Sequence, residues 1–438
     1  MCLEISPLVY GQKKIPKTVI FGTIRNYQNV LEIADRSDIG SLQNSNSNLS
    51  FVPDSLGRFS IELSVDRPTY FRIARSLLYL FPCDKLEVDM NYNDASKSNF
   101  KGKHSEENDY LKHTLYPKAG SFLQGGTNVQ STLEKSISKI LALANERRKL
   151  LYSYKKFSNE FRFLEDGRIS ADILNSIYSL RTYFPLVHKI KGDSLIAFDK
   201  KFLLVRDSFA KKNAPVLLNS KLLQLEVYRD VLPAILKLTD TVSTDFGQIK
   251  DWIYAKNLVQ EMRINNRLKD ASLFHAEVNK IKTTAYRDKV IETYDKLVAF
   301  NGENAIDLKL TDTSGNKVQL SSFKGKNIYI DIWATWCGPC IKEQPYLDTL
   351  QKKFKDNSNI IFLSLSIDHD FTYWKNYVNR VKLSGFQFVI DLGELNAYSV
   401  VEIPRAILID KDFKIYEISG PMPSNSESIK ILEKLLLD

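Results

Sequence analysis

A short apolar run followed by two closely spaced cysteines constrains the fold of this chain more than any other feature. Residues 328–333 predict a buried strand, and the residues after Cys340 predict a helix. Cys337 and Cys340 therefore lie where that helix begins. Unpaired N–H groups and the positive end of the helix dipole stabilise a thiolate at such a place. We expect Cys337 to be the nucleophile, and Cys340, one turn later, to attack a mixed disulfide formed on Cys337.

Other known uses of a Cys-x-x-Cys pair fit this sequence less well. A structural zinc site needs a second pair of ligands, and the other cysteines, Cys2 and Cys83, lie far upstream. Attachment of a c-type haem needs His after the second cysteine, where this chain has Ile341. A peroxiredoxin-like site would place Pro and Thr at Ile330 and Ala334. The histidines also lack metal-ligand spacing, so we expect a redox-active dithiol with no metal and no other cofactor.

Several motifs surround the dithiol. Two short strand-like runs flank a Ser-Gly turn at residues 314–315, and a Phe-Lys-Gly-Lys run at 323–326 leads into the predicted central strand. An Ile-Pro pair at 403–404 precedes a further apolar run. With these motifs, residues 301–438 resemble a thioredoxin-fold domain of the TlpA-like or ResA-like type.

The resemblance implies a role for Asp331. This residue stands six positions before Cys337, where thioredoxins keep a buried carboxylate beneath the dithiol. Burial raises the pKa of a carboxyl group, and such a group can accept the proton that Cys340 loses before it attacks. An ordinary exposed aspartate at a strand end is the alternative.

The resemblance also implies a substrate groove beside the dithiol. Pro404 matches the proline that is cis in thioredoxins and faces the two cysteines, whereas a trans proline at a strand start is the alternative. The backbone of Ile403 would pair with an extended substrate, and Trp336 would line the same groove.

The rest of the chain differs in character from this domain. Short runs of period-two alternation at 18–24, 30–33, 57–63, 69–73 and 85–89 predict a small antiparallel sandwich. It resembles the β-rich N-terminal domain that often precedes thioredoxin domains in exported proteins of Gram-negative bacteria. In the region that follows, apolar residues recur every three or four positions, which predicts helices. We predict a multidomain α+β chain with a β-sandwich at 13–105, a helical region at 106–300 and a thioredoxin-like α/β domain at 301–438.

Cys83 lies in a run that matches a loop of that β-rich domain, at a position that usually carries Gly. Nothing nearby in the sequence would activate its thiol, so we expect Cys83 to be a half-buried structural residue and not a redox partner.

Charge and composition exclude some partners. The formal net charge of +9 is spread among acidic residues without a dense basic run, which favours a solvated surface over nucleic-acid binding. No stretch is long enough for a membrane-spanning helix. Residues 1–10 are mildly apolar, but Glu4 and Pro7 interrupt them, so they are not a typical secretory signal. Export to the periplasm or cell envelope is therefore implied by the resemblance alone. Cys2 is either a free thiol or a lipidation site that would allow membrane association.

These features predict thiol–disulfide exchange on exported proteins. The expected partners are protein disulfide substrates and an electron-donor protein. The Gly-Pro pair between the cysteines resembles thioredoxin, with a potential of about −270 mV, and not the DsbA type at about −120 mV, which favours a reductase or isomerase over an oxidase. The alternative is a ligand-binding or scaffold protein in which the first two regions hold a ligand and the dithiol is secondary.

Overall fold

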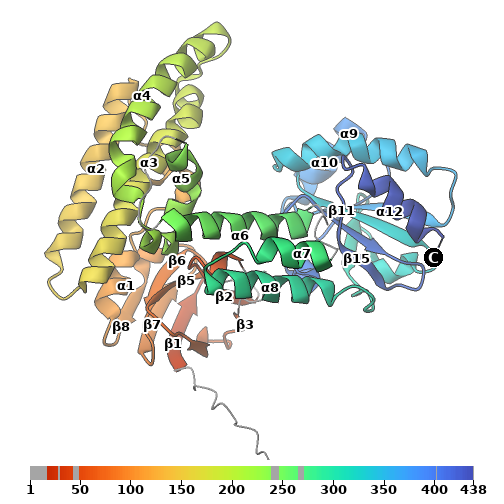
Figure 1. Ribbon diagram of the computed structural model, residues 1–438, viewed down its shortest axis with the longest axis horizontal. Helices are drawn as coiled ribbons and strands as arrows, with labels where there is room; N and C mark the ends of the chain where they lie inside the picture. Colours follow the sequence, from red (N-terminus) through yellow and green to blue (C-terminus); the bar gives the residue numbers. More distant parts are fainter. Residues whose placement is uncertain are drawn as a thin grey trace, which may run out of the picture. The chain divides into compact units, whose positions relative to one another are not determined.

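A computed structural model describes residues 17–27, 30–42, 49–237, 246–264, 271–400 and 402–437 (Figure 1). The chain forms two compact units. The N-terminal unit consists of Met1–Gly40 and Asn48–Phe246, and the C-terminal unit consists of Ser41–Ser47 and Gly247–Asp438. Cys2 and the apolar run at residues 1–10 lie outside the described residues.

Two four-stranded sheets form the β-rich part of the N-terminal unit, in the orders β4-β1-β7-β8 and β3-β2-β5-β6. The alternation that predicts strands is visible in β7, where every second side chain is buried. Buried residues of both sheets share one apolar core, so the sheets form a sandwich. The strands are β1 (Lys17–Arg25), β2 (Leu31–Asp35), β3 (Leu49–Phe51), β4 (Arg58–Ser64), β5 (Thr69–Ile73), β6 (Ser76–Leu80), β7 (Lys85–Asn91) and β8 (Asn99–Lys101).

One strand pairing in this sandwich differs from the prediction of an antiparallel architecture. β1 pairs with β7 in parallel, whereas the other pairings of the two sheets, as far as the structure describes them, are antiparallel. Between β1 and β7 the chain passes through the second sheet, and such a long connection allows it to return in the same direction.

Cys83 is a second difference from the sequence-based expectation. It is a free, exposed cysteine in the turn between β6 and β7, so the expected half-buried setting is wrong. Its φ angle of 59° lies in the left-handed region that favours glycine. This conformation explains why a glycine suits the position, and it places the residue in a turn outside the sandwich core.

Helices make up the rest of the N-terminal unit. Thr132 and Ser158 cap α2 and α3, because their side chains accept hydrogen bonds from backbone N–H groups three residues later. The buried Glu165 of α3 accepts hydrogen bonds from Tyr70 of β5 (2.6 Å) and from Arg168 (2.9 Å). This contact joins the sandwich to the helices. The helices of this unit are α1 (Ser105–Leu111), α2 (Leu133–Ser153), α3 (Asn159–His188), α4 (Asp193–Leu217) and α5 (Glu226–Leu236).

The C-terminal unit contains a seven-stranded sheet of order β10-β9-β13-β12-β11-β14-β15 (Figure 1). The Ser-Gly turn joins β9 to β10 as predicted, and Asp312 stabilises it by accepting from two backbone N–H groups. The strands are β9 (Lys309–Asp312), β10 (Lys317–Gln319), β11 (Asn327–Trp333), β12 (Ile360–Ser366), β13 (Phe386–Val389), β14 (Arg405–Ile409) and β15 (Ile415–Gly420).

Central strand β11 is buried along its whole length and pairs with β12 in parallel and with β14 antiparallel. Helices α9 and α12 share an apolar core with β11, β12 and β14. This arrangement confirms the predicted thioredoxin-like α/β architecture. The helices of the unit are α6 (Phe246–Ile264), α7 (Ala271–Val278), α8 (Thr284–Val298), α9 (Gly338–Lys353), α10 (Phe371–Val381), α11 (Leu392–Leu395) and α12 (Glu427–Leu435).

Helices α6 to α8 belong to the same compact unit as the sheet, and α8 contacts β15. The side chain of Asn301, which follows α8, accepts a hydrogen bond from the backbone of Ile418 in β15 at 2.9 Å. The division of the chain at 105/106 and 300/301 stays a prediction about independent folding. Within the described ranges, no helix is both long and apolar enough to cross a membrane.

Gly22 in β1 provides a test of the N-terminal sandwich. Its φ is +142°, and a Cβ atom at this position would lie 1.9 Å from the carbonyl oxygen of Val88 in β7. We expect Gly22→Ala to lower the free energy of unfolding by about 2 kcal/mol or more, because the backbone strain and the clash add. Urea denaturation followed by circular dichroism measures this change. Gly247→Ala is the control, because Gly247 has open space around its Cβ position, and an equal loss in both variants would contradict the prediction.

Candidate active site

The two cysteines lie at the start of α9, shortly after strand β11 ends. Cys337 is the N-cap residue of that helix, and its Sγ accepts a hydrogen bond from the backbone N–H of Cys340 at 3.2 Å. Pro339 lies in the first helical turn, where no backbone N–H is needed. The two cysteines form a disulfide, and their side chains are largely buried, with 6% of Cys337 and 1% of Cys340 exposed.

The surroundings of Cys337 allow a partner to approach it. Trp336, directly before it, is 66% exposed, and the space around the Cβ position of Gly338, directly after it, is open apart from the adjoining residues and the backbone of its own helix. Cys337 is also at the positive end of the α9 dipole, which stabilises a thiolate once the disulfide is reduced. The roles of Cys337 as nucleophile and Trp336 as part of a groove stay predictions.

Asp331 lies in the middle of β11, opposite Ser364 of β12 and Ala406 of β14. It is only 5% exposed, so it is not an ordinary aspartate at an exposed strand end. Burial, together with the nearby charge of Glu343, raises the pKa of its carboxyl group from 3.8 to about 7. A carboxyl group with this pKa can both accept and release a proton near neutral pH.

Glu343 is a site residue that the sequence reasoning missed. It lies on α9 one turn after Cys340, and its carboxylate accepts hydrogen bonds from the backbone N–H (2.9 Å) and hydroxyl (2.8 Å) of Ser424. These bonds hold a negative charge where it acts on Asp331. The signal in the sequence was the spacing of three residues between Cys340 and Glu343, which places both on one helix face.

A second missed residue, Asp368, fixes the loop that leads to the dithiol. Its buried carboxylate accepts hydrogen bonds from the backbone N–H (2.9 Å) and hydroxyl (2.6 Å) of Thr335, and from the hydroxyl of Ser366 (2.6 Å). Thr335 stands two residues before Cys337, so these bonds restrict the position of Cys337. The sequence feature that could have identified Asp368 is its place just after β12, at the edge of the sheet where the parallel strands β11 and β12 both end.

Pro404 precedes β14, and the Ile403–Pro404 peptide bond is cis, as the resemblance implies. β14 runs antiparallel to β11, with Arg405 opposite Ile332. The start of β14 therefore lies at the end of the sheet where β11 leads to Cys337. Ile403 and Pro404 are half-buried, and their role in binding a substrate stays a prediction.

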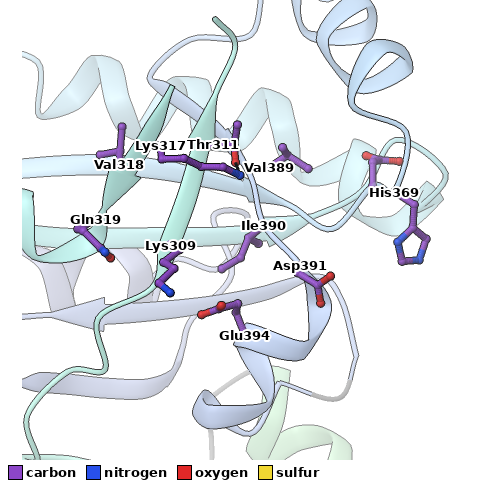
Figure 2. A pocket seen from close by; sticks show the side chains of 11 residues that line it. Lys309, Thr311, Lys317, Val318, Gln319, His369, Val389, Ile390, Asp391 and Glu394 are labelled. Atoms are coloured by element: carbon purple, nitrogen blue, oxygen red, sulfur yellow. Dashed lines mark hydrogen bonds between the residues drawn. The ribbon is translucent and has the colours of Figure 1, made fainter. Parts of the chain in front are cut away.

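Two cavities lined by both polar and apolar residues border this region. One, of about 500 Å³, is lined by charged side chains of both signs, among them Lys309 and Glu394, and by His369 (Figure 2). Asp368 also lines it. The other, of about 410 Å³, is lined by Asp331 together with Gln344, Gln351, Ser364 and Gln387, among other residues. In the described part of the chain, no group of three or more His, Cys, Asp or Glu residues could hold a metal ion.

Known proteins resemble the C-terminal part of the chain. Residues 299–436 match the family model described as Redoxin. The thiol-disulfide oxidoreductase ResA of Bacillus thuringiensis subsp. konkukian is 38% identical over 122 residues, which cover 27% of this chain and 69% of that protein. ResA of Geobacillus kaustophilus is 33% identical over 144 residues, which cover 31% of this chain and 82% of that protein. The chain belongs to the ResA-like thiol-disulfide oxidoreductases of the thioredoxin family.

A solved structure also resembles part of this ResA-like chain. The thioredoxin domain of a thiol-disulfide oxidoreductase from Bacteroides vulgatus is 29% identical, with a TM-score of 0.28, and the match covers 31% of this chain and 96% of that domain. The residues that match the Redoxin family model, 299–436, include both cysteines of the dithiol.

The position of Cys337 predicts which thiol of this ResA-like protein reacts first. After reduction, we expect Cys337 to be alkylated faster than Cys340 at neutral pH, with half of its maximal rate reached below about pH 7.5, because the helix N-terminus stabilises its thiolate. Iodoacetamide labelling across a pH series, read by peptide mass spectrometry, measures both rates. The exposed Cys83 is an internal reference. Faster labelling of Cys340 would contradict the prediction.

The buried Asp331 predicts how stability depends on pH. Its pKa is higher in the folded state (about 7) than the ordinary value of 3.8, so its contribution to the free energy of unfolding falls as the pH rises from about 4 to about 7. Asp331→Asn should remove this loss, so we expect the variant to be more stable than the wild type at pH 8. Its gain in the free energy of unfolding should be about 2–3 kcal/mol larger at pH 8 than at pH 5.

Tryptophan fluorescence during urea denaturation measures this effect. Trp252, Trp333, Trp336 and Trp374, the four tryptophans of the chain, all belong to the C-terminal unit. Asp356→Asn, at an exposed position of the same unit, is the matched control. A gain in stability that is the same at both pH values would mean that Asp331 is ionised throughout this range.

Proposed function

We propose that this oxidoreductase reduces or isomerises disulfide bonds of exported proteins through the Trp-Cys-Gly-Pro-Cys segment at residues 336–340. The observation that supports it most directly is Cys337 at the N-cap of α9, paired with Cys340, at the end of the strand that buries Asp331. The matched relatives are named thiol-disulfide oxidoreductases, which agrees with this chemistry.

In the first step, the thiolate of reduced Cys337 attacks one sulfur of a client disulfide. A bond forms between Sγ of Cys337 and that sulfur, and the client disulfide breaks, so that its second sulfur leaves as a thiolate. The helix N-terminus stabilises the attacking thiolate, and the exposed Trp336 together with the backbone of Ile403 holds the client segment in an extended conformation.

In the second step, Cys340 resolves the mixed disulfide. Its thiol transfers a proton to the carboxylate of Asp331, and the resulting thiolate attacks Sγ of Cys337. The Cys337–Cys340 disulfide forms and the client leaves with both cysteines reduced, so two electrons have passed to the client. An electron-donor protein then returns two electrons to the dithiol. For isomerisation, the released client thiolate attacks a different client disulfide, and the thiolate freed there attacks the client sulfur of the mixed disulfide. Cys337 then leaves as a thiolate without the second step, and no net electrons pass to the client.

The cellular setting is part of the same proposal. Export to the periplasm or cell envelope is proposed because the C-terminal domain and the β-rich N-terminal sandwich together resemble exported proteins. Protein disulfides persist in such oxidising compartments, so clients are available there. Association with the membrane and the identity of the electron donor belong to this proposal as well.

Stopped-flow kinetics with insulin as a disulfide substrate tests the mechanism. We expect the wild-type protein, re-reduced by dithiothreitol, to reduce insulin and Cys337→Ser to be inactive. Cys340→Ser should form the mixed disulfide without resolving it. Asp331→Asn should form the mixed disulfide at the wild-type rate but resolve it at least about tenfold more slowly at pH 7, because it lacks the proton acceptor.

Asp356→Asn, exposed and on a surface loop, is the control and should match the wild type in both steps. Equal slowing of both steps in Asp331→Asn would mean that Asp331 does not accept the proton from Cys340. A wild-type protein that neither reduces insulin nor equilibrates with glutathione would favour the scaffold alternative over the proposed function.

A further inference from the structure

The N-terminal unit contains a cavity that plays no part in the chemistry above. Its volume is about 930 Å³, and it is bordered by residues of β5 and β6, of the segment after β7 and of the segment after α1. This volume is in the range of small-molecule binding sites. Its walls include Leu77 and Tyr116 as well as polar and charged side chains.

The charges around this cavity are unbalanced. Arg36, Arg72, Arg75 and Lys112 line it, whereas Asp94 is the single carboxylate among its lining residues. The carboxylate of Asp94 already accepts hydrogen bonds from the backbone and hydroxyl of Ser96 and forms an ion pair with Lys97 at 3.2 Å. Lys112 is likewise paired, with Asp109 at 3.2 Å, so the excess positive charge comes from the three arginines. A positively charged concave site attracts anions.

Arg72 is the most constrained of these cations. One of its terminal nitrogens contacts Glu226 at 2.7 Å, which leaves other donors of the guanidinium group available. Burial lowers the pKa of Arg72; Glu226 opposes this effect, and the like charge of Arg36 lowers the pKa further. Glu226 interacts with the charges of both Arg72 and Arg36, so one carboxylate faces two half-buried guanidinium groups. A further anion would compensate the second positive charge.

Three residues that line the cavity also have polar atoms without a partner in the described part of the chain. Among the described residues, the Nε atoms of Arg36 and Arg72 and the Oγ1 atom of Thr114 are buried and have no hydrogen-bond partner, and all three residues line the cavity. A buried donor without a partner is unfavourable.

We propose that this cavity binds a ligand through an oxyanion, either a carboxylate or a phosphate group. Arg36 and Arg72 donate charge-assisted hydrogen bonds to the oxyanion, and the hydroxyl of Thr114 donates a further one. The exposed Arg75 attracts the ligand, and the ring of Tyr116 packs against its body. The site uses neither the dithiol nor Asp331, so it stands or fails independently of the proposed function.

Isothermal titration calorimetry of the full-length oxidised protein at low ionic strength tests this site. Pyrophosphate is the probe for a phosphate source and citrate is the probe for a carboxylate source. We expect at least one probe to bind with a Kd below about 1 mM. Arg36→Gln should weaken that binding about tenfold or more, because it removes a charged donor. Thr114→Val should weaken it about two- to tenfold.

Lys191→Gln, at an exposed position of the same unit outside the cavity lining, is the matched control and should bind like the wild type. The stronger of the two probes identifies the source of the oxyanion, and equal binding supports the shared chemistry. If Arg36→Gln does not fold, Thr114→Val decides the question. Absence of binding by both probes overturns the proposal, and so does binding that the folded cavity variants leave unchanged.

Discussion

The pairing of β11 with β12 on one side and with β14 on the other is the constraint on which the active site depends. It buries Asp331 between Ser364 and Ala406 and ends β11 just before the segment that leads to Cys337. Because β14 is antiparallel to β11, the same pairing brings the cis-proline segment to that end of the sheet. A shift of register by one residue would turn Asp331 to the opposite face and separate it from the helix that carries the cysteines.

The position of Asp331 works against stability and in favour of the proposed chemistry. A buried carboxylate close to Glu343 is costly when ionised, and this cost is what raises its pKa to about 7. The cavity of about 410 Å³ beside Asp331 contains buried polar atoms of Gln344, Gln351 and Gln387 that have no partner among the described residues. Asp331 and other polar residues line this cavity, which is large enough for water. In the proposed mechanism, a proton on Asp331 can therefore exchange with solvent while a client covers Cys337.

The sequence predicts those parts of the structure that are set by local patterns. The strand before the dithiol, the helix after it and the hairpin around the Ser-Gly turn are such cases. β6 was missed because all five of its residues are buried, which removes the alternation that identifies a strand. The parallel pairing of β1 with β7 depends on the path of the chain through a second sheet. Glu343 and Ser424, which are in contact, lie 81 residues apart in the sequence, and no pattern within either segment predicts this contact.

A raised pKa alone would not have identified the active site. Burial raises the pKa of Asp172 in α3 to about 7 as well, and this residue is as inaccessible as Asp331. Asp172, however, accepts a hydrogen bond from Ser121 and interacts with the charge of Arg168, so its surroundings compensate it within a helical core. For Asp331, the charge that shifts the pKa belongs to another carboxylate, and the strand that carries it leads to the Cys337–Cys340 disulfide. The distinction between a structural and a reactive buried acid therefore lies in what surrounds the carboxyl group, and only the folded chain brings those surroundings together.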